Sequence, residues 1–212
     1  MRIAFDRRVW PGGILFCLLS LAVGWGFAAW WAAGFFAFVM VAHFAFFRDP
    51  ERTVTQTDGV LSPADGEIIG IENVPEDRLF REDAVKISIR LTLFDVHITR
   101  SALKGVVTYQ EYVSGKFENA LGSGSLAENE SNWIGIEDGA KRVLICQRAG
   151  LWARRIYSDI RVGQPIGSGD RIGIICYGSR VLCFVPKKNF ETRIRIGQKV
   201  TAGVDVLGVW VG

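Results

Sequence analysis

Residues 162–173 carry the sequence VGQPIGSGDRIG, and a similar pattern, IGQKVTAGVDVLG, returns at residues 196–208. In each copy a Gly-Gln step precedes a short apolar run, and a later glycine precedes another such run. The second copy has one extra residue after that later glycine. Paired short strands joined by glycine turns of this kind are typical of a compact barrel or sandwich. We therefore expect a compact, barrel-sandwich-like β domain.

The remainder of the chain after residue 50 also favours a mostly β fold. Short runs rich in β-branched and aromatic residues alternate with turns that contain Gly, Pro, Asp or Asn. The predicted strands are residues 66–71, 85–91, 105–112, 133–136, 142–147, 154–160, 172–176, 181–185 and 204–211. Residues 116–132 differ from these runs, because they are rich in Gly, Ser, Glu and Asn and are typical of a loop with a short helical turn.

The N-terminal region has a different composition. Residues 14–47 contain no Asp, Glu, Lys or Arg, whereas a helix that spans a bilayer needs about 20 apolar residues. Gly24-Trp25-Gly26 lies near the middle of this run and offers a place to turn. Basic residues favour the cytoplasmic side of a membrane, and they flank both ends of the run: Arg2, Arg7, Arg8, Arg48 and Arg52.

We therefore predict a membrane-anchoring helical hairpin at residues 1–50 and a β-rich catalytic domain at residues 51–212, on the cytoplasmic side of the cell membrane. A single tilted helix and a helix that lies in the membrane interface are alternatives. A cleaved signal peptide is disfavoured, because the apolar run exceeds the roughly 7–15 residues of such a segment and no small-residue cleavage site follows it.

Composition argues against several classes of function. The 212-residue chain has a net charge of +3, which is too small to indicate nucleic-acid binding. Its four cysteines form no C-x-x-C pair, so we predict no metal site. Cys146, Cys176 and Cys183 lie in apolar strand-like runs, where a free cysteine packs as a small core residue. Reduced thiols fit a cytoplasmic domain.

Three short motifs supply the groups that activate a serine. Ser179 follows Gly178 between two apolar runs, Asp65 lies in the sequence SPADG, and His97 lies in FDVHITR. Together they offer a hydroxyl, a carboxylate and an imidazole. His97 is the one histidine outside the apolar N-terminal region. Asp95 precedes it by two residues and is an alternative partner for the imidazole. Taken singly, Asp65 is typical of a turn residue. His97 taken singly is typical of a histidine on a strand whose ring makes its hydrogen bonds within the fold.

As an ordered set, these motifs resemble those of the short, membrane-anchored phosphatidylserine decarboxylases. The resemblance runs from the N-terminal hairpin to the C-terminus. The matching segments are residues 62–66, 95–100, 114–119, 128–130, 153–156 and 177–181.

The resemblance implies that the chain is a proenzyme that cuts itself between Gly178 and Ser179. Residues 1–178 would become the β chain and residues 179–212 the associated α chain, with Ser179 converted to a covalent pyruvoyl cofactor. The implied reaction is decarboxylation of the membrane lipid phosphatidylserine to phosphatidylethanolamine. His97 and Asp65 would activate Ser179 for the cut, and His97 would later return a proton to the product.

Other readings of the residues stay open. Arg100, Lys116 and Arg180 are candidates to bind the lipid phosphate, or they are solvated charges. A membrane-bound serine hydrolase could use the same Ser179, His97 and Asp65 without any cut. A barrel-sandwich carrier or scaffold is a non-enzymatic alternative, although the carrier lysine between methionines is missing, since Met1 and Met40 are the only methionines.

Overall fold

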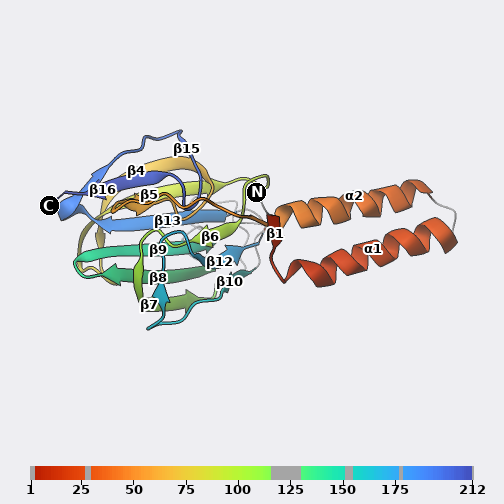
Figure 1. Cartoon of the computed structure of the whole chain (residues 1–212), viewed down its shortest axis with the longest axis horizontal. Coiled ribbons are helices and arrows are strands. Elements are labelled where there is room, and N and C mark those ends of the chain that lie inside the picture. Colours follow the sequence, from red (N-terminus) through yellow and green to blue (C-terminus); the bar gives the residue numbers. More distant parts are fainter. Residues whose placement is uncertain (1–2, 27–29, 116–129, 151–154, 177–178, 212) are drawn as a thin grey trace. The chain divides into compact units, whose positions relative to one another are not determined.

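The computed structural model describes residues 3–26, 30–115, 130–150, 155–176 and 179–211 (Figure 1). For Ser179, which is central to the argument, the description covers the backbone. The chain divides into two compact units, Met1–Glu51 and Arg52–Gly212. Each unit is described by itself.

The first unit contains two apolar helices. Strand β1 (Ile3–Phe5) pairs antiparallel with β2 (Arg48–Pro50), and between them lie α1 (Val9–Gly26) and α2 (Trp30–Phe46). The helices pack side by side (Figure 1), and the Ser20 hydroxyl of α1 donates to the Ala33 carbonyl of α2 over 2.9 Å. Trp25, Trp31 and Phe38 are exposed, as on helices that are apolar on all sides. The expected helical hairpin is therefore present.

The two helices differ in length. Within the described residues, α1 is the one helix that is long and apolar enough to cross a membrane, at 18 residues. Helix α2 is similarly apolar but has 17 residues. Both described helices are thus apolar, and of the two α1 alone reaches the length of a membrane span.

The second unit is built almost entirely from strands, as expected. An eight-stranded antiparallel sheet runs in the order β11-β7-β8-β9-β13-β5-β4-β15, and two three-stranded sheets, β10-β12-β6 and β14-β16-β3, complete it. The strands are β3 (Val60–Leu61), β4 (Gly66–Glu76), β5 (Glu82–Leu91), β6 (Ile98–Arg100), β7 (Gly105–Val113), β8 (Ser131–Asp138), β9 (Lys141–Ala149), β10 (Ile156–Ser158), β11 (Pro165–Ile166), β12 (Arg171–Ile175), β13 (Ser179–Pro186), β14 (Phe190–Thr192), β15 (Lys199–Val200) and β16 (Val206–Trp210). A 3₁₀ turn, η2 (Lys187–Asn189), follows β13.

The repeat seen in the sequence supplies the strand at each of the two edges of the large sheet. Strand β11 from the first copy pairs with β7, and β15 from the second copy pairs with β4. The two copies use the same turns, because Gly163 and Gly197 have φ angles of 87° and 83°. The Gln164 and Gln198 side chains each accept a backbone N–H bond over 3.2 Å, from Arg161 and Arg195 respectively.

The structural similarity between the two repeat copies extends to two further segments, residues 62–76 and 101–113. The sequence pattern did not reveal that these two segments resemble each other. Ser62 and Ser101 each donate a backbone bond of 2.7 Å, to the carbonyls of Asp205 and Asp170 in the two repeats. Gly66 and Gly105 have φ angles of 150° and 155°. A Cβ at either glycine would lie 2.2–2.3 Å from a carbonyl oxygen of the neighbouring strand. Both strands also carry a bulge at the same point. Asp65 and Lys104 therefore occupy equivalent positions.

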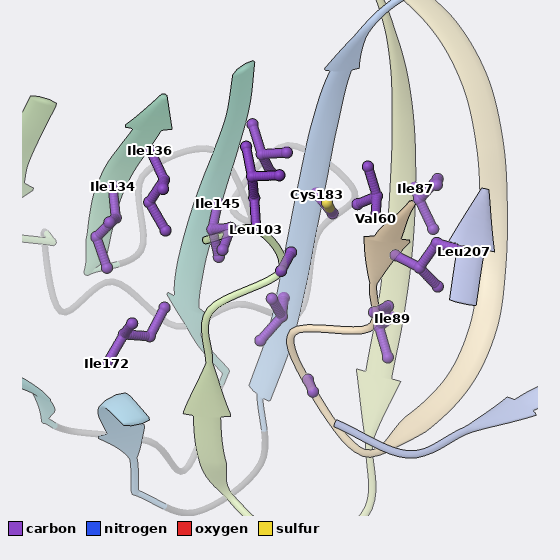
Figure 2. Packing of buried hydrophobic residues seen from close by; sticks show 14 of the residues in the cluster. Val60, Ile87, Ile89, Leu103, Ile134, Ile136, Ile145, Ile172, Cys183 and Leu207 are labelled. Atoms are coloured by element: carbon purple, nitrogen blue, oxygen red, sulfur yellow. The ribbon is translucent and has the colours of Figure 1, made fainter. Parts of the chain in front are cut away.

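A hydrophobic core lies on the inner face of the large sheet. Figure 2 shows Ile134, Ile145, Cys183 and Ile87, from four strands of this sheet, in one cluster with Leu207 and Ile172 from the two smaller sheets. Alternate residues of β13 point the other way, and on this outer face Leu182 and Phe184 join a smaller cluster.

The cysteines of the second unit pack as the sequence predicted. Cys146, Cys176 and Cys183 are free and buried. Burial raises the pKa of the Cys146 and Cys183 thiols to about 12, so both stay protonated at neutral pH.

Candidate active site

His97 lies just before β6 and is fully buried. Its Nδ1 atom is 3.0 Å from the backbone carbonyl oxygen of Asp95. A carbonyl oxygen only accepts hydrogen bonds, so Nδ1 must carry the proton and donate it. In the neutral ring, Nε2 is then the basic nitrogen. The backbone at Asp95 thus selects the tautomer that a general base needs.

Backbone pairing places His97 next to the segment that leads to the predicted cut. The amide of Ile175 donates to the His97 carbonyl over 3.2 Å, and Ile98 is paired with Ile174 of β12. Strand β12 ends at Ile175 and β13 begins at Ser179. Gly178 and Tyr177 lie outside the described residues.

Ser179 is the first residue of a strand at the centre of the large sheet. Its backbone pairs with Leu91 of β5 on one side and with Ala149 of β9 on the other (Figure 1). Residue 179 belongs to the same alternate set as Val181 and Cys183, which face the main core. The pairing on both sides fixes the position of this residue within the sheet.

Asp65 is held by two hydrogen-bond donors. Arg52 Nη2 donates to Asp65 Oδ2 over 2.7 Å, and the Ala202 amide donates to Oδ1 over 2.8 Å. Burial raises the pKa of Asp65 above its usual value, although the Ala202 amide and the Arg52 charge oppose this effect. The charge of Asp95 makes a smaller contribution in the same direction as burial and also raises the pKa of Asp65.

The structure brings the segments that carry Asp65 and His97 to the same end of the domain. The Arg100 amide, three residues after His97, donates to the Pro63 carbonyl over 2.8 Å. The Asp65 carboxylate is engaged with Arg52 and Ala202. The Asp95 carboxylate accepts from the amide and the hydroxyl of Thr92, each over 2.7 Å. Asp95 thus contacts the imidazole through its carbonyl rather than through its side chain.

Sequence reasoning missed Arg52 as a site residue. The sequence suggested only an orientation signal after the apolar run. In the structure its side chain and that of Asp65 are each 15% exposed, and they form the most buried ion pair among those described in the second unit. No local pattern joins residues 52 and 65, so the signal was absent from the sequence.

A buried polar chain next to His97 was also missed. Gln147 Nε2 donates to Thr99 Oγ1 over 3.1 Å, and Asn132 Nδ2 donates to Gln147 Oε1 over 2.8 Å. All three side chains are nearly inaccessible to solvent. This chain ties β6, which follows His97, to β9 and β8.

Glu130 supports the other side of β12. Its carboxylate accepts a 2.8 Å bond from the Ile156 amide, and Ile156 pairs with Ile175. Burial and the Glu130 hydrogen bond raise the pKa of Tyr112 to about 12. The end of β12 is therefore flanked by His97 on one side and by the Glu130-anchored strand β10 on the other.

The three candidates for lipid phosphate binding have different surroundings. Arg100 Nη1 donates to the Gly169 carbonyl over 3.0 Å, which is a structural contact. Lys116 lies outside the described residues. Arg180 lies on the outer face of the sheet, beside Arg148. Within the described ranges, no group of three or more His, Cys, Asp or Glu residues is placed to hold a metal ion.

Comparison with known proteins gives consistent matches over nearly the whole chain. The family model described as phosphatidylserine decarboxylase matches residues 39–208. A phosphatidylserine decarboxylase proenzyme of Symbiobacterium thermophilum is 42% identical over 207 residues, which cover 95% of this chain and 94% of that protein. The proenzyme of Burkholderia mallei is 41% identical over 206 residues, covering 95% and 93%. No solved structure matches.

Proposed function

The chain belongs to the phosphatidylserine decarboxylase family, and we propose that it forms its own pyruvoyl cofactor by cutting the backbone between Gly178 and Ser179. The observation that carries this proposal is the pairing around the cut. A buried histidine bonds the last residue of β12, and the next strand begins with Ser179 at the centre of the sheet.

In the proposed maturation, His97 acts first as a general base. Its Nε2 takes the proton from the Ser179 hydroxyl, and the oxygen attacks the Gly178 carbonyl, so that the amide bond becomes an ester. Elimination then releases the carboxyl end of residues 1–178 and leaves a dehydroalanine. Hydrolysis of this group yields the pyruvoyl group and ammonia. The Asp95 carbonyl holds the imidazole tautomer that the first step requires.

Asp65 is the carboxylate that we assign to this centre. Its negative charge would stabilise the imidazolium that forms when His97 accepts a proton. Arg52 and the Ala202 amide favour the ionised form of Asp65, while burial of the carboxylate opposes it. The described bonds of the Asp65 carboxylate go to Arg52 and Ala202, so the contribution that we assign to Asp65 is electrostatic.

The residues around Ser179 fit a pyruvoyl group at that position. A pyruvoyl carbonyl supplies an electrophile for the substrate amine and accepts the electrons released with carbon dioxide. His97 would then donate a proton to the substrate carbon. The backbone bonds to Leu91 and Ala149 would hold residue 179 in place after it becomes a chain end.

The same pairing supports an association of the two product chains. The α chain would contain β13, β14, β15 and β16, and β13 pairs with β5 and β9 of the β chain along most of its length. The substrate's acyl chains would stay in the bilayer. We propose that residues 1–50 anchor the enzyme there, with the second unit on the cytoplasmic side.

The mass of the purified full chain tests this proposal. We expect two chains, residues 1–178 and 179–212, with the α chain carrying a blocked N-terminus. Ser179→Ala should give one uncut chain without decarboxylase activity. Ser88→Ala, the same change on the neighbouring strand β5, should still be cut between Gly178 and Ser179. An intact wild-type chain with a free serine would instead support a serine hydrolase, and an intact chain with an adduct would support a carrier.

A further inference from the structure

A polar pocket of about 220 Å³ lies on the outer face of the large sheet, away from the main core. It is formed by β4, β5, β9 and β13. The lining residues that matter are Gly70, Glu72, Lys86, Ser88, Arg148 and Arg180. Arg180 and Leu182 of β13 line the pocket, whereas Val181 and Cys183 of the same strand face the main core. The pocket therefore lies on the face of the sheet opposite the main core.

The pocket exists because two small residues are neighbours across the sheet. Gly70 pairs with Ser88, and in the equivalent half of the sheet Tyr109 pairs with Gly135. In that half the corresponding space is filled by the side chains of Leu79 and Tyr109, since a Cβ on Gly135 would lie 2.6 Å from Leu79 Cδ2 and 2.9 Å from Tyr109 Cβ. A Cβ on Gly70 would meet nothing closer than Glu72 Oε1 at 3.2 Å.

Positive charge is concentrated around this pocket. Arg148, Arg180 and Arg90 are directly opposite one another on β9, β13 and β5, although like charges in that arrangement destabilise a sheet. Arg90 is compensated by Glu67, and Lys86 by Glu72, each at 2.8 Å. Across the part of the chain that the structure describes, no ion pair with a carboxylate is formed by Arg148 or Arg180.

The Arg148 guanidinium is also incompletely satisfied. Its Nε atom is buried and has no hydrogen-bond partner within the described part of the chain. A buried donor without a partner is costly. A bound anion would satisfy this donor and offset the repulsion between Arg148 and Arg180.

We propose that this pocket binds a phosphate group. Two arginine forks from adjacent strands suit the oxygens of a phosphate, and the Ser88 hydroxyl can donate a further bond. Lys86 lines the same pocket and is paired with Glu72. The pocket is smaller than the roughly 300–1,000 Å³ of sites that enclose a drug-sized molecule. It therefore fits a single phosphate group, which is supplied either by a phospholipid head group or by free inorganic phosphate.

Calorimetric titration of the full chain in a non-ionic detergent tests the proposal. One arm uses inorganic phosphate, and the other uses dihexanoyl phosphatidylglycerol, a short-chain phosphodiester lipid, below its micelle concentration. We expect the wild type to bind at least one probe, and the tighter probe identifies the source. Arg148→Gln should weaken that binding on the order of tenfold or more, because a charge-assisted bond is lost. Gly70→Leu should abolish it by filling the pocket.

Arg142→Gln is the matched control, because Arg142 lies on the same strand and face as Arg148 but outside the pocket. It removes the same charge and should bind as the wild type does. If Arg148→Gln unfolds the chain, Arg180→Gln, which removes the other arginine of the pocket at a partly exposed position, takes its place with the same expectation. The proposal is overturned if neither probe binds, if Arg142→Gln weakens binding as much as Arg148→Gln, or if Gly70→Leu leaves binding unchanged.

Discussion

Substitution of Arg52 by Gln offers a sharp test of the proposed centre, because it changes the charge next to Asp65 without touching a reacting group. The substitution removes the 2.7 Å bond from Arg52 Nη2 to Asp65 Oδ2 and leaves the Ala202 amide as the remaining donor. Arg52 lowers the pKa of Asp65. Its loss should therefore raise that pKa further and reduce the ionised fraction at any given pH.

The burial of the pair sets the expected size of the effect. Exposed ion pairs are worth about 0–1 kcal/mol, whereas a hydrogen bond to a charged group with restricted solvent access is worth about 1.5–3 kcal/mol. Both side chains here are 15% exposed, so the higher range applies. Since about 1.4 kcal/mol corresponds to a factor of ten in rate, self-cleavage should slow by roughly 10- to 100-fold.

The pH dependence has a definite sign. Asp65 has a raised pKa in the folded chain, so the fold loses some stability as the pH rises from the usual aspartate pKa through the raised value. If cleavage needs ionised Asp65, its rate should rise with pH over the same window. Arg52→Gln should move this rise to higher pH, and Arg52→Lys, which keeps the charge, should restore most of the rate.

Cell-free synthesis in buffers of different pH, followed by a time course of uncut and cut chains on denaturing gels, measures this rate directly. Arg90→Gln is the control, because Arg90 forms a pair of similar length with Glu67 at an exposed position. The reasoning would be refuted if Arg52→Gln cleaved at the wild-type rate with an unchanged pH profile, or if Arg90→Gln slowed cleavage equally.

Three further predictions concern the reaction centre, the anchor and the core. Asp65→Asn, which removes the charge that supports the imidazolium, should slow self-cleavage at least as much as Arg52→Gln, by about 10- to 100-fold or more, while Asp95→Asn, whose backbone carbonyl still holds His97, should slow it much less; the reverse order on the same gels would identify Asp95 as the partner. A truncated chain starting at Glu51 should fold and cut itself, yet lose more activity on bilayer substrate than on a short-chain analogue; a folded chain that stays uncut would make residues 1–50 part of the catalytic fold. Ile145→Ala, at a fully buried core position, should lower the free energy of unfolding by about 2–5 kcal/mol, and Ile145→Val by about 0.5–1.5 kcal/mol; equal losses in urea denaturation would contradict the packing described.

The sequence predicted the long strands because their composition and turns are local properties. All nine predicted strands correspond to strands of the structure, from β4 to β16. The strands that were missed, such as β3, β11 and β15, contain two residues each. Such strands are too short to show an alternating pattern, and they form because a neighbouring edge is available.

The site was less predictable, since its supporting contacts join distant parts of the chain. The Ala202 amide that binds Asp65 is 137 residues away from it in sequence, and Thr99 and Gln147 are 48 residues apart. The pocket proposed to bind phosphate depends on the register that sets Gly70 beside Ser88. Composition can flag His97, Asp65 and Ser179 as reactive types, but the groups that tune them become visible only when the strands are paired.

The equivalence of Asp65 and Lys104 provides the molecule with a built-in reference for mutagenesis. Both residues precede a glycine with nearly the same backbone angle, and both follow a serine that bonds an equivalent aspartate carbonyl. The backbone at this point therefore accepts a lysine in one half and an aspartate in the other. A loss of maturation on replacing Asp65, together with an unaltered fold, can be assigned to chemistry. The paired replacement at Lys104 reports what a change at this backbone position costs the fold, apart from the bonds to Arg52 and Ala202 that the Asp65 carboxylate makes.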